Sequence, residues 1–122
     1  VFRCVRNVMH PESIFLFDVT TEYNINAHFD GQCFMNTMGD TALEWTNFYD
    51  EETKVVTSIL HFMKSDGTTS TEFHYQKLYP VDEIKEILVS EGFVIKGIYG
   101  DYTMDPPDEK TVMINFVVSA NL

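Results

Sequence analysis

The sequence predicts a mixed α/β chain, and three observations carry that prediction. An apolar run, Ile14–Val19, follows a short helical stretch and a proline. Apolar and polar residues then alternate from residue 41 to residue 78, which is typical of antiparallel strands. A helical stripe that ends at Gly92 separates these strands from two further β-rich runs. This order is not a complete fold of any common α/β type, because the first strand needs parallel neighbours that the chain does not supply.

The first 19 residues predict one helix and one strand. Phe2, Val5 and Met9 recur at helical spacing, so residues 1–9 read as the end of an amphipathic helix. The run Ile14–Val19 is apolar on both faces until Asp18, which predicts a strand buried on both sides, as in a parallel sheet covered by helices. Asp18 fits the rule that α/β sites lie at the carboxyl ends of strands, and it fits a turn equally well.

The middle of the chain predicts an antiparallel meander. Residues 20–40 resist assignment, although Gly31 and Gly39 mark bends. The turn at Asp66-Gly67 is a strong hairpin signal, and we expect it to be tight and exposed. The three strands expected around this and the preceding turn are Thr41–Tyr49, Lys54–Lys64 and Thr69–Leu78.

The last part of the chain predicts a helix followed by a long hairpin. Val81, Ile84 and Leu88 form the helical stripe, and Gly92 occupies the position of a C′ residue. Phe93–Tyr99 and Thr111–Ala120 are β-rich and flank a loop that contains two prolines.

Composition excludes several classes of function. The formal charge of −11 disfavours nucleic acid and anionic membranes as partners. No apolar run approaches the roughly 20 residues of a membrane span. The two cysteines, Cys4 and Cys33, form no disulfide framework, which favours reduced thiols in a cytoplasm. The four histidines lack the spacing of metal ligands, so no metal site is expected.

The order of these elements, with the residues they carry, resembles the class I S-adenosylmethionine-dependent methyltransferase family. The resemblance is to a branch with an antiparallel insertion between its fifth strand and its last helix. Five stretches carry it over nearly the whole chain: residues 14–21 as the fifth strand, Trp45–Asp50 as the opening of the insertion, Glu72–Tyr79 as its Glu-x-His-x-Gln segment, Asp82–Phe93 as the last helix, and Tyr99–Tyr102 with Pro106-Pro107 as the final hairpin loop.

The resemblance implies the C-terminal part of a Rossmann-like sheet whose last strand is antiparallel, with an inserted three-stranded antiparallel meander. Taken as an isolated chain, the class would be α+β. The regions are residues 1–19 for a helix and strand of the core, 20–79 for the connector and insertion, and 80–122 for the last helix and terminal hairpin. The chain departs from the family pattern at Lys77, where the family has Arg, and at Pro80, where it has a Ser cap.

The implied activity is methyl transfer from S-adenosylmethionine to a small-molecule acceptor. The family builds its donor site from elements that would lie upstream of Val1. The chain itself begins inside a predicted helix. We therefore expect a piece of a longer enzyme that is inactive alone and binds its donor through a missing N-terminal half. An exposed edge near Ile14–Val19 would make the isolated piece a homo-oligomer or a swapped dimer.

The resemblance places the acceptor side of the active site on the insertion. The candidates are Trp45, Tyr49, His74, Gln76, Lys77 and Tyr79. Trp45 also suits a core position, and His74 suits either a general base or an exposed strand position. Alternation puts His74 and Gln76 on one face and Lys77 and Tyr79 on the other, so one face cannot present all four to one ligand. The alternative function is a stand-alone α+β domain that binds a ligand or a partner without catalysis.

Overall fold

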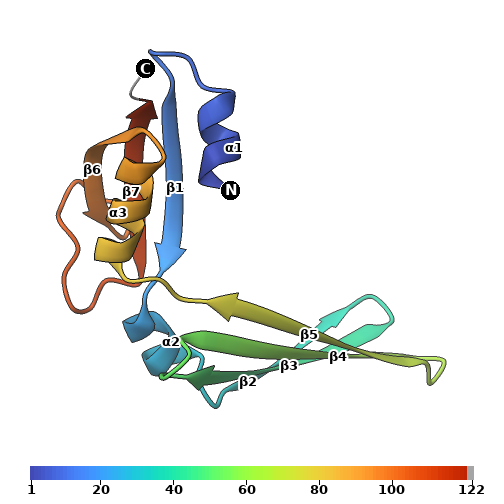
Figure 1. Cartoon of the computed structure of the whole chain (residues 1–122). Helices are drawn as coiled ribbons and strands as arrows, with labels where there is room; N and C mark the ends of the chain where they lie inside the picture. Colours follow the sequence, from blue (N-terminus) through green and yellow to red (C-terminus); the bar gives the residue numbers. More distant parts are fainter. Residues whose placement is uncertain (121–122) are drawn as a thin grey trace. The chain divides into compact units, whose positions relative to one another are not determined.

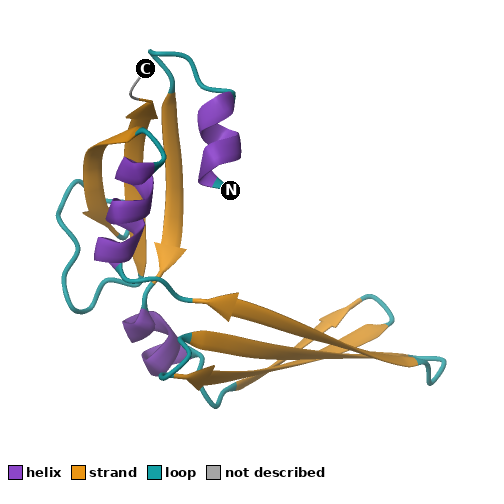
Figure 2. Cartoon of the chain, viewed as in Figure 1, coloured by secondary structure: helices purple, strands orange, loops and turns teal. Residues whose placement is uncertain are grey.

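The computed structural model describes residues 1–120, and its helices and strands are drawn in Figures 1 and 2. The chain forms two compact units. Unit 1 comprises residues 1–23 and the chain from Tyr79 onward, and unit 2 comprises Asn24–Leu78. Residues 121 and 122, the last of the predicted region 80–122, lie outside the described residues.

Unit 1 is a three-stranded sheet with two helices. Its elements are α1 (Phe2–Asn7), β1 (Ile14–Thr20), α3 (Val81–Ser90), β6 (Phe93–Gly100) and β7 (Met113–Ala120). The strand order is β1-β7-β6, and β7 pairs antiparallel with both neighbours. The last strand therefore runs antiparallel, as the sequence predicts.

One face of this sheet carries the core of unit 1. Phe17 of β1 lies opposite Phe116 of β7, and their rings stack with centroids 4.8 Å apart. Leu88 of α3 and Phe116 are both fully buried in the same cluster. Phe2 of α1 packs against the same cluster, with its ring centroid 5.2 Å from that of Phe17. Both helices thus cover one face of the sheet.

The opposite face of β1 is open, which corrects the prediction of a strand buried on both sides. Ile14 and Leu16 point away from the core and are 57% and 66% exposed. Among the described residues, the helices that could cover the sheet pack on the face of Phe15 and Phe17. The run of residues 14–19 is therefore apolar on both faces, but the described residues cover only the face of Phe15 and Phe17.

Unit 2 is a four-stranded antiparallel meander with one short helix. Its elements are α2 (Glu22–His28, which begins at the end of unit 1), β2 (Cys33–Met38), β3 (Thr41–Asp50), β4 (Val55–Lys64) and β5 (Thr69–Lys77), in the sheet order β2-β3-β4-β5. The three predicted strands are present, and β2 adds a fourth from the segment that resisted assignment. The sequence of β2, CFMNTM, lacks alternation because all six residues are exposed.

Left-handed glycines lie in three turns of unit 2, whereas Lys54 takes this conformation in the turn between β3 and β4. Gly31, Gly39 and Gly67 have φ of 71°, 62° and 87°, so the two predicted bends and the hairpin tip are confirmed. At the tip, the Thr68 N–H donates to Asp66 Oδ1 at 2.8 Å. Hydrogen bonds from Thr68 to this exposed carboxylate hold the pKa of Asp66 below its usual value. Asp66 keeps negative φ, so only glycine occupies the left-handed region in this turn.

No helix within residues 1–120 is both long enough and apolar enough to cross a bilayer.

The core position of Leu88 generates a stability prediction. We expect Leu88→Ala to lower the free energy of unfolding by about 2–5 kcal/mol, because the side chain is fully buried and its loss leaves a cavity. The next residue, Val89, is 64% exposed on the same helix, and Val89→Ala should stay within about 0.5 kcal/mol of the parent. Urea unfolding followed by circular dichroism measures both, and equal effects would refute the placement of α3.

Candidate functional site

The strand register of unit 2 gathers chemically useful side chains on one face of its sheet. Three rows run across β3, β4 and β5: Trp45 with Leu60 and Glu72, Asn47 with Ser58 and His74, and Tyr49 with Val56 and Gln76. Residues that lie directly opposite each other in neighbouring strands point to the same side of a sheet. This side, called the pocket face here, is also the side on which Phe29, next to α2, contacts Trp45.

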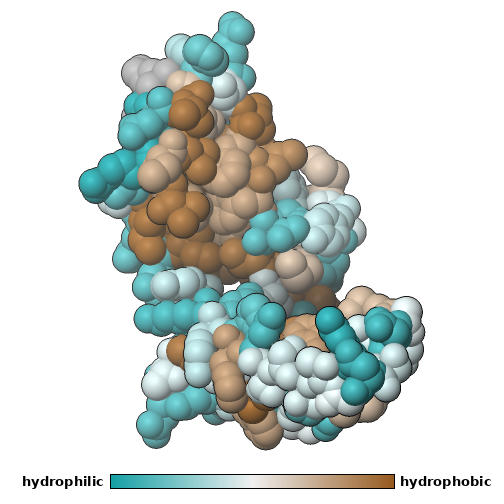
Figure 3. Space-filling model, turned by 90° about the vertical axis from the view of Figure 1, so that its right-hand side faces the viewer, coloured by the Kyte–Doolittle hydropathy of each residue, from teal (hydrophilic) through white to brown (hydrophobic). Residues whose placement is uncertain are grey.

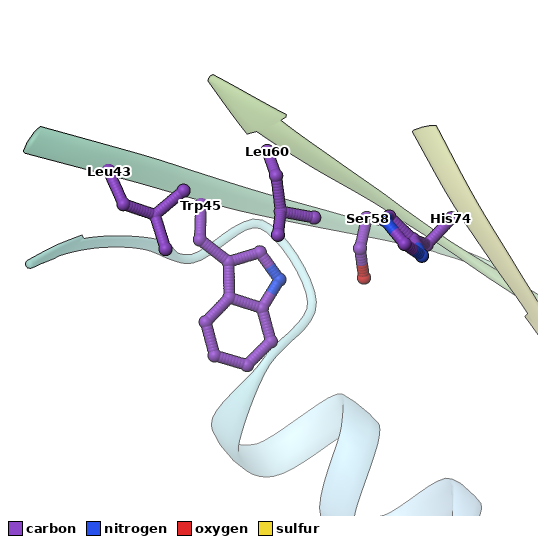
Figure 4. Close-up of a pocket in the computed structure, with 5 residues that line it drawn as sticks. All are labelled: Leu43, Trp45, Ser58, Leu60 and His74. Atoms are coloured by element: carbon purple, nitrogen blue, oxygen red, sulfur yellow. The ribbon is translucent and has the colours of Figure 1, made fainter. Parts of the chain in front are cut away.

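The pocket face contains a cavity of about 340 Å³. Its walls are Leu43 and Trp45 of β3, Ser58 and Leu60 of β4, and His74 of β5 (Figure 4). The leucines and the indole ring are half-buried and make the cavity largely apolar. Ser58 and His74 supply polar groups at one end. Ligand sites commonly have this composition, and the volume lies near the lower end of their range of about 300–1,000 Å³.

Aromatic packing fixes the ring that forms the back of the pocket. The Trp45 ring lies 5.3 Å from Phe34 of β2 and 6.0 Å from Phe29, measured between centroids. The same ring therefore packs within unit 2 and lines the cavity.

His74 carries a carboxylate partner. Its Nε2 lies 2.9 Å from Glu72 Oε2, two residues earlier on the same strand and on the same face. In neutral imidazole only one ring nitrogen is protonated. A proton on Nε2 would donate to Glu72 and leave Nδ1 as the lone-pair nitrogen. This arrangement suits a group that accepts a proton at the edge of the pocket. Both side chains are more than half exposed, at 60% and 57%.

A buried polar pair lies below the pocket. Ser58 Oγ donates to Asn47 Oδ1 at 2.6 Å, and Asn47 is only 1% exposed. Within residues 1–120, two buried donors have no acceptor: Nδ2 of Asn47 and Nε1 of Trp45. A buried polar group without a partner costs about 1–3 kcal/mol, so two such donors beside one cavity are unusual.

Tyr49 and Gln76 lie one row beyond the pocket. Tyr49 is half-buried and packs against the small core of Ile25, Val56 and Leu78. Its backbone N–H donates to Asp30 Oδ1 at 2.8 Å. Gln76 is exposed opposite Val56. Both share the pocket face without lining the cavity.

Lys77 and Tyr79 lie apart from the pocket. Lys77 alternates onto the opposite face of β5, as the sequence predicts. Tyr79 follows the strand and belongs to unit 1. The structure thus brings together Trp45 and His74 out of the predicted site residues, keeps Tyr49 and Gln76 on their face, and separates the other two.

Three polar residues of the site were missed by sequence reasoning. Ser58 and Asn47 become partners only through the register of β3 against β4, which depends on the length of the turn at residues 51–54. Glu72 was visible two residues before His74, at a spacing that puts both on one strand face. That spacing was the available signal for the carboxylate–histidine pair.

The known proteins to which this chain is similar are all named as methyltransferases. YqeM of Bacillus subtilis (strain 168), whose name describes it as a methyltransferase, is 28% identical over 118 residues, which are 94% of this chain and 48% of that protein. A S-adenosylmethionine-dependent methyltransferase from Clostridium acetobutylicum superposes with a TM-score of 0.79 at 19% identity, over 99% of this chain and 50% of that one. The CcbJ methyltransferase from Streptomyces caelestis gives a TM-score of 0.72 at 10% identity, over 98% and 51%. No protein-family model matches the chain.

The chain has the fold of half of a class I S-adenosylmethionine-dependent methyltransferase.

The strand order of unit 1 is β1-β7-β6, with the antiparallel strand in the middle, and it agrees with the order expected for the end of the methyltransferase sheet. The chain spans about half the length of the curated relatives it matches. It is consistent with the C-terminal fragment that the sequence predicts.

The donor-binding elements of the methyltransferase fold do not occur in the described chain. Within residues 1–120, the residues immediately before α1, α2 and α3 are Val1, Thr21 and Pro80, so no Gly-rich turn opens a helix. No group of three or more His, Cys, Asp or Glu side chains in this range could hold a metal ion. The residues present therefore do not fit a site for S-adenosylmethionine.

Unit 1 has a larger, mainly apolar hollow of about 690 Å³ between α1, β1 and α3. Its lining includes Phe2, Phe15, Phe17, Tyr79 and Ile87, together with the ion pair of Arg3 and Glu91. In Figure 3, hydrophobic residues gather over one broad area of unit 1. The lining rings already pack on one another, so the hollow is a continuation of the hydrophobic core with few groups that could orient a ligand.

Asp18, at the carboxyl end of β1, has a specific partner in unit 1. Tyr102 Oη donates to Asp18 Oδ2 at 2.6 Å. The backbone holds this tyrosine in a left-handed conformation, φ 59°, and its N–H donates to Asn115 Oδ1 at 2.7 Å. The hydrogen bond to the carboxylate raises the pKa of the Tyr102 phenol.

The Asn47–Ser58 pair generates a prediction about stability. Ser58→Ala removes the donor to a buried amide oxygen, so we expect a loss of about 1–3 kcal/mol in the free energy of unfolding. Ser70→Ala, at an exposed position of β5, serves as the matched control and should change stability by less than about 0.5 kcal/mol. Denaturant unfolding measures both, and a neutral Ser58→Ala would contradict the buried pair.

The Tyr102–Asp18 bond generates a prediction about pH. The folded state favours the protonated phenol, so the stabilisation is complete below the unfolded tyrosine pKa of about 10 and is lost as the pH rises through the higher folded value. Asp18→Asn should lower the pKa of Tyr102, read from phenolate absorbance against a Tyr102→Phe reference. Asp105→Asn, an exposed acid of the same loop, should leave it unchanged.

Proposed function

We propose that this chain is the acceptor-side half of an S-adenosylmethionine-dependent methyltransferase, and that a small-molecule acceptor binds in the cavity of unit 2. The observation that carries the proposal is the cavity itself, which combines an aromatic and aliphatic wall with a carboxylate-paired histidine on the insertion of a methyltransferase fold. The methyl donor binds to the part of the protein that contains the Gly-rich turn of the family.

The chain's own residues have two tasks in such a reaction. Leu43, Trp45 and Leu60 hold the apolar body of the acceptor and exclude water from one side of it. An N–H or O–H group that receives a methyl group must lose its proton, and His74 Nδ1 takes that proton. The charge that then forms on the imidazole is stabilised by Glu72, 2.9 Å from the other ring nitrogen.

The open face of unit 1 suggests where the rest of the enzyme packs. Ile14 and Leu16 are exposed on the side of β1 that α1 and α3 do not cover. We infer that the N-terminal half of the methyltransferase covers this side and pairs with the free edge of β1. A homo-oligomer or a swapped dimer of the chain would cover the same surface when that half is absent. The exposed free thiols of Cys4 and Cys33 fit a reducing cytoplasm.

A stand-alone binding domain is the second candidate, and one observation favours it. The cavity is built entirely from Leu43, Trp45, Ser58, Leu60 and His74, which all belong to the compact unit 2. Binding therefore needs no other segment of the protein. The two functions differ in one measurable respect, since only the enzyme also binds S-adenosylmethionine and releases S-adenosylhomocysteine.

The test of the catalytic role compares two histidines of the same sheet. In the whole protein that contains this chain, we expect His74→Asn to lower kcat for methyl transfer by about 10²–10⁴-fold, because the proton acceptor is lost. His61→Asn is the matched control, since His61 lies on the opposite face, where it contacts Thr71 Oγ1 at 2.9 Å. Its rate should stay within about twofold of the parent, which is less than 0.5 kcal/mol.

The outcomes separate the proposals. Equal rates for both histidine variants would eliminate His74 as the proton acceptor. Failure of the whole protein to bind S-adenosylmethionine in calorimetry would eliminate the methyltransferase proposal and leave the binding domain. Glu72→Gln should fall between the parent and His74→Asn, because it leaves the imidazole in place and removes only the charge beside it.

A further inference from the structure

The unused hydrogen-bond donors of unit 2 lie on the same sheet face as the cavity. Trp45 lines the cavity, and Asn47 lies two residues further along the same face of β3. Asn47 accepts through its oxygen from Ser58, another cavity residue, so the amide is oriented toward the cavity wall. The remaining capacity of both side chains is donation only: an indole N–H and an amide N–H.

The position of the indole nitrogen indicates how a ligand would reach it. Figure 4 shows this nitrogen on the side of the ring that faces Ser58 and His74, which is the polar end of the cavity. The N–H is buried, although its ring lines the cavity. A ligand atom inserted beside Ser58 therefore reaches it only when the indole or the short serine side chain rotates. The indole has no lone pair on its nitrogen, so only a hydrogen-bond acceptor can satisfy it.

The charge around the cavity selects among possible acceptors. Glu72 stands at the rim, and the whole chain carries a formal charge of −11. A carboxylate or phosphate would be repelled by this field, whereas a neutral carbonyl oxygen would not. Leu43 and Leu60 complete a mainly apolar wall, which favours a ligand whose remaining surface is apolar.

We propose that the cavity of unit 2 recognises a neutral, largely apolar compound through a carbonyl oxygen that accepts hydrogen bonds from Trp45 Nε1 and Asn47 Nδ2. The inference rests on the proposed function, since it defines the class of acceptor for the same cavity. It extends that function because it assigns recognition of the ligand's carbonyl group to Trp45, Asn47 and Ser58. His74 keeps the separate role of proton acceptor.

The experiment uses two probes that differ in one oxygen. Acetophenone carries a ketone, and ethylbenzene has nearly the same shape without it. Both are titrated into the whole protein labelled with ¹⁵N on its tryptophans, and Trp45→Phe identifies the resonance of the Trp45 indole. We expect acetophenone to move the indole proton downfield, as hydrogen bonding does, and ethylbenzene to cause only a ring-current change.

The second readout is the ratio of the two probe affinities, compared between the parent protein and a variant. Differences in hydration between the probes cancel in this comparison, because they are the same for both proteins. In Trp45→Phe the preference for acetophenone over ethylbenzene should fall by about threefold to tenfold, the loss of one neutral hydrogen bond. Leu43→Ala is the control and should weaken both probes by the same factor, because it removes only apolar contact.

Three results would overturn the inference: an identical indole response to both probes, an unchanged preference in Trp45→Phe, or no binding of either probe. Its failure is distinguishable from that of the proposed function. Ketone preference in a protein that transfers no methyl group would refute only the enzyme. Methyl transfer by a protein without ketone preference would refute only this assignment of the donors.

Discussion

The pairing of β1 with β7 holds unit 1 together. The two strands come from opposite ends of the chain, with Ile14 opposite Ser119 and Thr20 opposite Met113. This register puts Phe17 against Phe116 and so assembles the core that α1 and α3 cover. The rest of unit 1 depends on it, because β6 reaches β1 only through β7. The same pairing places Asp18 beside the loop that carries Tyr102.

Local patterns were sufficient to predict most of the elements. The alternation of residues 41–78 predicted β3, β4 and β5 to within a residue or two at each end, since a meander is built from neighbouring segments joined by recognisable turns. Gly92 marked the end of α3 because it alone there could take φ of 87°. By contrast, β2 escaped prediction because an edge strand with both faces exposed carries no hydrophobic period.

The candidate site was predicted less completely than the fold. Trp45 and His74 were named from a resemblance, and the structure places both at one cavity. Their roles remain predictions. The contribution of Asn47 and Ser58 follows from a register that no single-strand pattern encodes. Tyr79 was grouped with them by the same resemblance, yet β5 ends at Lys77 and unit 1 resumes at Tyr79.

The connectivity of the two units also sets an order of assembly during synthesis. Every strand of unit 2 pairs with its neighbour in sequence, so these contacts need only short loops and can form on an emerging chain. β1 precedes all of these strands in the chain, and its partner β7 follows all of them. The pairing of β1 with β7 therefore cannot form until the whole of unit 2 has been synthesised.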